Sequence, residues 1–128
     1  TPVVNTKLKD LIKNDFFTFK NKKSLFAMTA HIIFNDIDPI NTATHSKKIN
    51  NLIRKNIKFN HILISDDISM KGLKYSIKEN TIRAFNAGCN LVLHCNGNYK
   101  EMLIVAENSP RLSKFITKKT SQFYRILS

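Results

Sequence analysis

Short apolar runs alternate along the chain with stretches that place an apolar residue at every third or fourth position. Short continuous apolar runs are typical of buried strands, and the 3.6-residue repeat predicts helices. The predicted strands cover residues 25–34, 61–65 and 90–95. The predicted helices cover residues 6–20 and the segments that follow Ser46, Ser76, Asn98 and Pro110. The chain therefore starts with a helix, repeats strand and helix three times, and ends with one more helix.

Local capping signals agree with these boundaries. Ser76 and Glu79 fit a capping box, in which the hydroxyl and the carboxylate each accept a free amide N–H at the helix start. Gly88 is placed as the C-terminal cap of the same helix. Further candidate N-caps are Thr6, Ser46 and Asn98. The segment from Asn35 to His45, which includes Asp38-Pro39, is predicted to be a loop.

Apolar strands joined by helices indicate a parallel sheet covered on at least one face, so the predicted fold class is α/β. Three strands make an incomplete domain, but they match about three strand-helix units of a (β/α)8 TIM-type barrel, whose usual size is about 250 residues. The chain also begins at Thr1, without a Met. We therefore expect residues 1–128 to be the C-terminal portion of such a barrel plus flanking helices, with the N-terminal half missing.

The composition fits one domain and excludes several classes of protein. With 128 residues and 42% hydrophobic content, the chain is long enough to bury one core. No run approaches the roughly 18 apolar residues of a membrane span. The two cysteines and four histidines show no metal-ligand spacing, so neither a metal nor another cofactor is expected. Cys89 and Cys95 are expected to be reduced, mostly buried thiols.

The net charge of +12 raises the question of nucleic-acid binding. The lysines, however, occur singly or in pairs along predicted helices, and no aromatic residues alternate with them to stack on bases. Joint enrichment in Lys, Asn and Ile is also what an AT-rich coding sequence produces. We therefore expect a solvated basic surface, with neither a nucleic acid nor a membrane as partner.

Two adjacent carboxylates end the predicted strand at 61–65. Asp66 and Asp67 follow it directly, and Gly72 then lets the chain turn away. The carboxyl ends of parallel strands form one edge of a sheet, where α/β proteins build their sites. Either aspartate is therefore a candidate catalytic group, and the equally open alternative is that they cap the loop that follows.

The other two predicted strands also end in polar side chains at this edge. His31 lies inside the first apolar run, near the exit of the strand, and His94 with Asn96 closes the third. Each histidine is either a site residue or a hydrogen-bonded core residue, and the core reading is the commoner one. No Gly-rich phosphate loop and no Gly-x-Ser-x-Gly elbow occur, which disfavours a nucleotide-binding loop and a serine hydrolase.

Six segments carry a resemblance to a known family. In chain order they are Ala27–Ile32, Asp36–Pro39, Thr42–Ser46, Leu52–Arg54, Ile64–Met70 and Ala87–Gly97. The most specific are Ser-Asp-Asp-x-Ser-Met in the fifth and Ala-Gly-Cys-x-x-x-Leu-x-Cys-Asn in the sixth. Together they resemble the C-terminal half of the bacterial β-N-acetylhexosaminidases of glycoside hydrolase family 3, the cytoplasmic enzymes of peptidoglycan recycling.

This resemblance implies a retaining glycosidase on a TIM-type barrel that releases terminal β-linked N-acetylglucosamine, typically from N-acetylglucosaminyl-1,6-anhydro-muropeptides. The first aspartate of the motif is the family's nucleophile and corresponds here to Asp66. Asp67 is expected to orient the loop or bind its backbone. His31 and Met70 are predicted substrate contacts, and a cytoplasmic location is expected.

The sequence also departs from the family pattern. The family's acid/base, a His-Asp dyad in a Lys-His-x-Pro-Gly-His-Gly…Asp-Ser-His stretch, is not in this chain, and Thr1 to Val4 resemble the residues that follow it. Thr42 replaces the usual Pro, and Asn90 the usual Asp. We therefore expect residues 1–128 alone to be inactive and to need the missing half of the barrel. The alternative is a non-catalytic α/β domain that binds a small ligand or a partner at the same edge.

Overall fold

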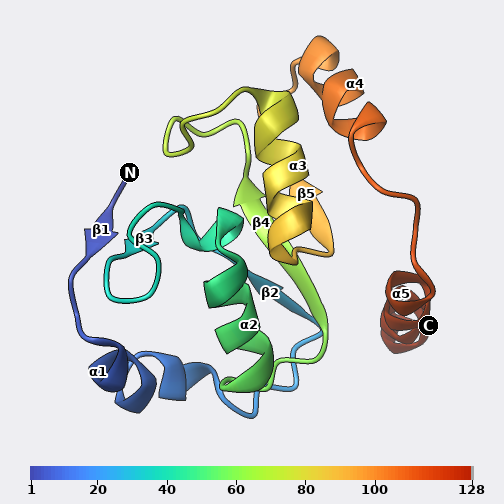
Figure 1. The fold of residues 1–128 in the computed structure, drawn as a ribbon. Helices are drawn as coiled ribbons and strands as arrows, with labels where there is room; N and C mark the ends of the chain where they lie inside the picture. The colour runs from blue at the N-terminus through green and yellow to red at the C-terminus, as the bar shows by residue number, and fades with distance from the viewer. Residues whose placement is uncertain (128) are drawn as a thin grey trace.

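The protein is a mixed α/β chain with parallel strands, and the computed structural model describes residues 1–127. The strands are β1 (Val3–Val4), β2 (Phe26–Met28), β3 (Ile33–Phe34), β4 (Ile62–Asp67) and β5 (Leu91–Leu93). The α-helices are α1 (Leu8–Lys13), α2 (Lys47–Lys55), α3 (Ile77–Ala87), α4 (Tyr99–Glu107) and α5 (Lys114–Leu127). The short 3₁₀ helices are η1 (Phe16–Phe19) and η2 (Ala43–His45) (Figure 1). None of the helices described is long and apolar enough to cross a membrane.

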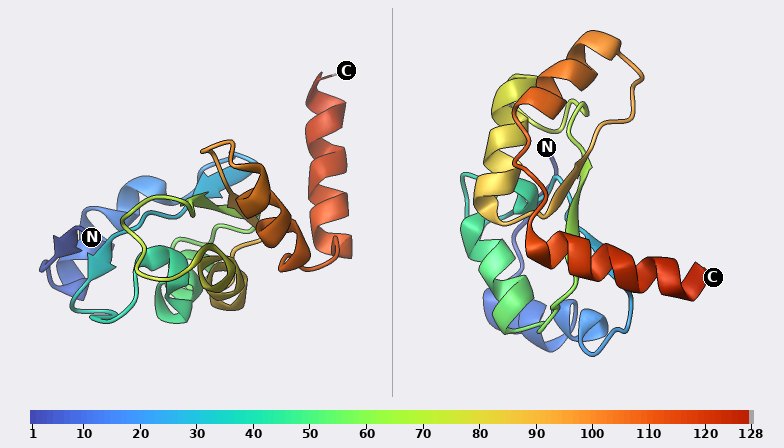
Figure 2. Two further views of the ribbon diagram at one scale, coloured as in Figure 1. Left: turned by 90° about the horizontal axis from the view of Figure 1, so that it is seen from above. Right: turned by 90° about the vertical axis from the view of Figure 1, so that its right-hand side faces the viewer.

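The main sheet has three parallel strands in the order β2, β4, β5. Ala27 of β2 lies opposite Leu63 of β4, and Ile64 lies opposite Leu91 of β5. Helices α2 and α3 lie on the same face of this sheet (Figures 1 and 2). Strands β1 and β3 form a separate parallel pair. Because the three main strands run the same way, their carboxyl ends meet at one edge.

The predicted helix at 6–20 is wrong in its length. Helix α1 ends one residue before Asn14, which adopts φ −108° and ψ −75°, and only the short η1 follows. The Asn14-Asp15 pair lies where the helix stops, and such side chains compete for backbone hydrogen bonds in a helix. Thr6 is not the N-cap either, because Lys7 occupies that position; the amide N–H of Leu8 donates instead to the carboxylate of Asp36, at 2.8 Å.

The predicted buried strand at 25–34 is two strands in different sheets, since β3 pairs with β1 and β2 with β4. Between them Thr29 still makes backbone hydrogen bonds to β4, and the ring of His31 donates to the carbonyl of Asp67. Strand β2 is also less buried than predicted, because Phe26 is 37% and Met28 is 56% exposed.

Capping bonds confirm several predicted helix ends. The side-chain oxygens of Ser46 and Asn98 each accept the amide N–H three residues further on, at 3.2 Å. Gly88 ends α3 with a φ of +121°, a backbone conformation that favours glycine. The predicted capping box forms only by half: Ser76 Oγ accepts the amide of Glu79 at 3.3 Å, while the Glu79 carboxylate accepts from an arginine one turn later.

The core lies between the main sheet and helices α2 and α3. Leu63 of β4 and Ala84 of α3 are each 0% exposed, and Ile49 of α2 is 3% exposed. Fully burying a Leu or Ile side chain stabilises the fold by roughly 1.5–3 kcal/mol, so these contacts hold the helices on the sheet. Helix α5 stands apart from α2 and α3, and its Phe123 packs edge-on against Phe26 with ring centroids 5.6 Å apart (Figure 2).

Candidate active site

Strand β4 carries Asp66 and Asp67 to the carboxyl edge of the sheet. The Asp66 amide donates to the carbonyl of Thr29 at 3.2 Å, so this residue still belongs to the β2–β4 ladder. Leu63, three positions earlier, lines a pocket with residues of α2. The pairing of β4 with β5 shifts register between Ile64 and Asp67, and Asp66 is not among the residues that line that pocket.

The Asp66 carboxylate is the less engaged of the pair. Its Oδ1 accepts the amide N–H of Asp67 at 2.8 Å, and within residues 1–127 its Oδ2 has no hydrogen-bond partner. The side chain is partly exposed. A carboxylate that is anchored through one oxygen and open at the other is suited to act as a nucleophile or a base.

Asp67 is held by donors from two directions. Ser69 donates its amide at 3.0 Å and its hydroxyl at 2.7 Å to Asp67 Oδ1, and the amide of Cys95 donates to the same oxygen at 3.2 Å. Burial opposes ionisation, but the donors of Ser69 and Cys95, together with nearby His94, hold the pKa of Asp67 below its usual value. Asp67 therefore stays ionised and ties the loop after β4 to the end of β5.

His31 links Asp67 to the loop before α2. Its Nε2 donates to the Asp67 carbonyl at 2.9 Å, and its Nδ1 lies 2.9 Å from the hydroxyl of Thr44. Thr44 is 0% exposed, and its hydroxyl lies 3.0 Å from that of Thr29. A Cβ added at Gly72 would lie 3.4 Å from that of His31, so the glycine lets the turn after β4 pass close to the ring. Both ring nitrogens are engaged within the protein, and a substrate contact by His31 stays a prediction.

Asp38 fixes the loop that carries Thr44. Its carboxylate is buried and accepts the hydroxyl of Ser46 at 2.7 Å and the amide of Asn41 at 3.2 Å. Burial opposes ionisation, but these donors keep the pKa of Asp38 below its usual value. Ser46 also caps α2. The loop whose Thr44 contacts His31 is therefore anchored to the first turn of that helix.

The remaining predicted edge residues differ in exposure. Met70 is 47% exposed in the turn after β4, and its contact with substrate stays a prediction. The side chain of His94 is only 5% exposed, and its Nε2 donates to Glu101 Oε2 at 2.8 Å. Asn96 donates to the same oxygen at 2.6 Å. The bonds from His94 and Asn96 lower the pKa of Glu101 and fasten the end of β5 to the first turn of α4.

The two thiols have different environments. Both cysteines are free, as expected for reduced thiols. Cys89 is buried as predicted, but Cys95 is exposed. Burial raises the pKa of the Cys89 thiol to about 11, which keeps it protonated at neutral pH.

Three residues of this network were missed by sequence reasoning: Ser69, Thr44 and Glu101. The Asp-x-Ser spacing, in which an aspartate accepts hydrogen bonds from the second residue after it, would have indicated Ser69. Thr44 and Glu101 bond to histidines 13 and 7 positions away on other elements, and no local pattern indicates such pairs.

The edge therefore offers one open carboxylate. The carboxylates of Asp67 and Glu101, which also lie at this edge, are occupied by protein donors. Among residues 1–127, no group of three His, Cys, Asp or Glu side chains is placed to hold a metal ion. Hydrolysis of a glycosidic bond requires a nucleophile or base and a second group that protonates the leaving oxygen. The described residues supply a candidate for the first role.

Comparison with known proteins identifies relatives of this chain. A beta-hexosaminidase of Haemophilus ducreyi is 33% identical over 89 residues, which cover 68% of this chain and 26% of that protein. A beta-hexosaminidase of Glaesserella parasuis is 32% identical over 102 residues, which cover 75% of this chain and 30% of that protein. The chain thus spans between a quarter and a third of the length of these relatives.

Solved structures of glycoside hydrolases superpose on this chain. The crystal structure of native NagZ from Neisseria gonorrhoeae superposes with a TM-score of 0.77 at 23% identity, covering 91% of this chain and 35% of that one. A glycoside hydrolase family 3 beta-N-acetylglucosaminidase from Paenibacillus superposes with a TM-score of 0.74 at 18% identity, covering 96% of this chain and 26% of that one. The model of the glycosyl hydrolase family 3 N-terminal domain matches residues 1–122, and the chain therefore belongs to glycosyl hydrolase family 3.

Proposed function

We propose that residues 1–128 form the C-terminal part of a (β/α)8 catalytic domain in a β-N-acetylhexosaminidase, with Asp66 as the nucleophile. The observation that carries this proposal is the contrast within the aspartate pair. Asp66 is anchored through Oδ1 and open at Oδ2, whereas Asp67 is saturated by Ser69 and Cys95. Family membership supports the reaction class, and the position of Asp66 at a strand end supports its role.

In the proposed reaction, Asp66 Oδ2 attacks the anomeric carbon of a terminal β-linked N-acetylglucosamine while the bond to the leaving oxygen breaks. That oxygen takes up a proton at the same time. Water then hydrolyses the glycosyl ester, which releases the sugar with retained configuration and restores the Asp66 carboxylate. The amide of Asp67 holds Asp66 Oδ1 at 2.8 Å and so keeps the attacking oxygen in place.

The general acid is the second part of the proposal. Because His31 and His94 are bonded within the protein, we place the acid in the part of the relatives' length that this chain does not span. General acid catalysis is worth roughly 10²- to 10⁴-fold. Residues 1–128 alone are therefore expected to show little or no turnover, and the complementary part of the barrel is the proposed partner.

The proposed substrate class is N-acetylglucosaminyl-1,6-anhydro-muropeptides, and the proposed location is the cytoplasm. Both rest on the motif resemblance around Asp66 and at Ala87–Gly97. We propose that His31 positions the site through the Asp67 carbonyl, and that exposed Met70 forms part of the wall beside the sugar.

A chimera tests the nucleophile. Residues 1–122 of this chain replace the corresponding stretch of the Haemophilus ducreyi beta-hexosaminidase, and turnover of a chromogenic N-acetyl-β-glucosaminide is measured. Asp66→Asn is expected to lower kcat by about 10³-fold or more. Asp15→Asn makes the same chemical change at an exposed position outside the edge and is expected to leave kcat unchanged.

Two further readouts separate the proposed mechanism from the alternatives. A fluorinated glycosyl trap should add its mass to the peptide that contains Asp66, and the first sugar product should have the β configuration. A label on another carboxylate would refute the assignment of Asp66. Full activity of the Asp66→Asn chimera would instead favour a non-catalytic role for this edge.

A further inference from the structure

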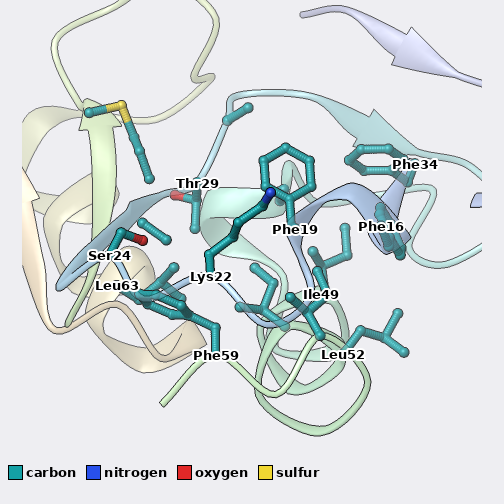
Figure 3. A pocket seen from close by; sticks show the side chains of 16 residues that line it. Phe16, Phe19, Lys22, Ser24, Thr29, Phe34, Ile49, Leu52, Phe59 and Leu63 are labelled. Atoms are coloured by element: carbon teal, nitrogen blue, oxygen red, sulfur yellow. The ribbon is translucent and has the colours of Figure 1, made fainter. Parts of the chain in front are cut away.

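A pocket of about 190 Å³ lies between β2, β4, α2 and η1 (Figure 3). Apolar side chains form most of its wall, among them Phe16, Phe19, Leu52, Phe59 and Leu63. In the close-up, Phe59 and Leu63 line one side and Phe16 and Phe34 the other. The lining includes Leu63 of β4 but neither Asp66 nor Asp67, so this pocket is distinct from the candidate active site.

Residues 20–25, which join η1 to β2, form no helix beside this pocket. After η1 the backbone turns at Asn21, whose φ is +59°, and reaches β2 without a further helix. Helix η1 leaves Phe17 65% and Phe19 61% exposed. Phe19 therefore forms an aromatic wall at the surface end of the pocket, where a ligand would enter.

The volume fits one small hydrophobic group. An engineered apolar cavity of about 150 Å³ lined by Leu, Ile and Phe stays dry and binds benzene. This pocket has a similar lining and a volume of about 190 Å³, which leaves room for a phenyl ring with a short alkyl stem. One of its few polar atoms, the Thr29 hydroxyl, already lies 3.0 Å from the hydroxyl of Thr44, so a water molecule would find few partners inside.

The mouth of the pocket is positively charged. Lys22 lines the pocket and is exposed, and its ammonium has no hydrogen-bond or ion-pair partner within residues 1–127. Lys20 and Lys23 flank it, and residues 20–24 contain no acid. An anion at the mouth would therefore pair with Lys22 without breaking an existing ion pair.

We propose that this pocket binds a small amphipathic carboxylate. The phenyl or branched alkyl group lies between α2 and the sheet, and the carboxylate pairs with Lys22. The proposal is independent of the glycosidase function, because neither Asp66 nor Asp67 lines the pocket. Three probes share the phenyl group and a short alkyl stem and differ in a polar head that is negative, neutral or positive: 3-phenylpropanoate, 3-phenylpropan-1-ol and 3-phenylpropylamine.

Titration of isotope-labelled residues 1–128 with the three probes, followed by NMR, measures both affinity and location. We expect the acid to bind about fivefold more tightly than the alcohol, as an exposed ion pair allows, and the amine to bind most weakly. Nuclear Overhauser contacts should join the phenyl ring to the methyl groups of Leu52 and Leu63. Added salt should reduce the preference for the acid and leave binding of the alcohol unchanged.

Variants separate the charge from the cavity. Lys22→Gln should abolish the preference for the acid without changing the affinity for the alcohol, whereas Lys118→Gln on α5 makes the same change elsewhere and should alter neither. Leu52→Trp should fill the pocket and weaken all three probes at least tenfold. If that variant does not fold, the contacts to Leu52 and the Lys22 pair decide the question.

Two results would overturn the proposal. Equal affinity for the acid and the amine would remove Lys22 as the recognition element, and absence of contacts to Leu52 and Leu63 would place the probes elsewhere. A concentration-dependent dimer that excludes the probes, seen by sedimentation, would make a second copy of this chain the occupant instead.

Discussion

Acidification is expected to destabilise this protein through His45. The imidazole is 9% exposed, and its buried Nε2 has no hydrogen-bond partner within residues 1–127. Its ring lies against Tyr75 with centroids 6.1 Å apart. Burial lowers the pKa of His45 from 6.5 to about 4; the Asn80 backbone and the Glu79 carboxylate oppose this shift, and the nearby Arg83 guanidinium adds to it.

The sign of the effect follows from proton uptake. Between pH 6.5 and about 4 the unfolded chain carries a proton on His45 that the folded chain does not, so the free energy of unfolding falls as the pH falls. At 1.36 kcal/mol for each pKa unit, the full loss is about 3 kcal/mol. About 2 kcal/mol of it is lost between pH 7 and pH 5. That is a large fraction of the roughly 5–15 kcal/mol by which domains are usually stable.

The assay is urea unfolding of residues 1–128 at pH 7, 6 and 5, followed by circular dichroism. This window excludes Asp38 and Asp67, because carboxylates with lowered pKa values lose their contribution mainly below about pH 5. His45→Leu should flatten the pH dependence by about 2 kcal/mol. His61→Asn, at a less buried histidine, should keep most of it. If His45→Leu retains the full wild-type dependence, the proton is taken up elsewhere and the reasoning fails.

Three substitutions test the fold by urea unfolding at pH 7. Gly88→Ala should cost about 1 kcal/mol or more, because φ is +121° and the new Cβ would lie 3.4 Å from that of Asn50; an unchanged midpoint would contradict this strain. Ser46→Ala should cost about 1–2 kcal/mol, since it removes both the cap of α2 and a donor to Asp38. Leu63→Ala should cost about 2–5 kcal/mol and Leu63→Met less than about 1.5 kcal/mol; equal losses would show that the core there is not close-packed.

Helix boundaries were largely predictable because their causes are local. The caps at Ser46, Gly88 and Asn98 involve atoms within about one turn of the chain, which a sequence pattern records. The early end of α1 at Asn14 was missed because Phe16 and its neighbours continue the apolar repeat beyond the break. Periodicity indicates which face is apolar, not whether the backbone stays helical.

Strand partners were not predictable in the same way. The apolar run at 25–34 is compatible with one strand or two, and only the pairing of β3 with β1 divides it. The exposure of Phe26 and Met28 likewise depends on what covers the second face of the sheet. The pattern of apolar and polar residues within β2 does not predict this. Both properties arise from segments far apart in the sequence.

The sequence by itself determined the order of the α-helices and of the three strands of the main sheet, the motif segments and the end of a strand at Asp66 and Asp67. It did not indicate β1, which precedes the first helix, or β3 as a separate strand. The tertiary structure decided how the two carboxylates differ. Cys95, 28 positions later, donates to Asp67 because β5 pairs with β4, and His31, 36 positions earlier, binds the Asp67 carbonyl. These bonds form only when the sheet assembles, and they leave Asp66 as the carboxylate with an open oxygen.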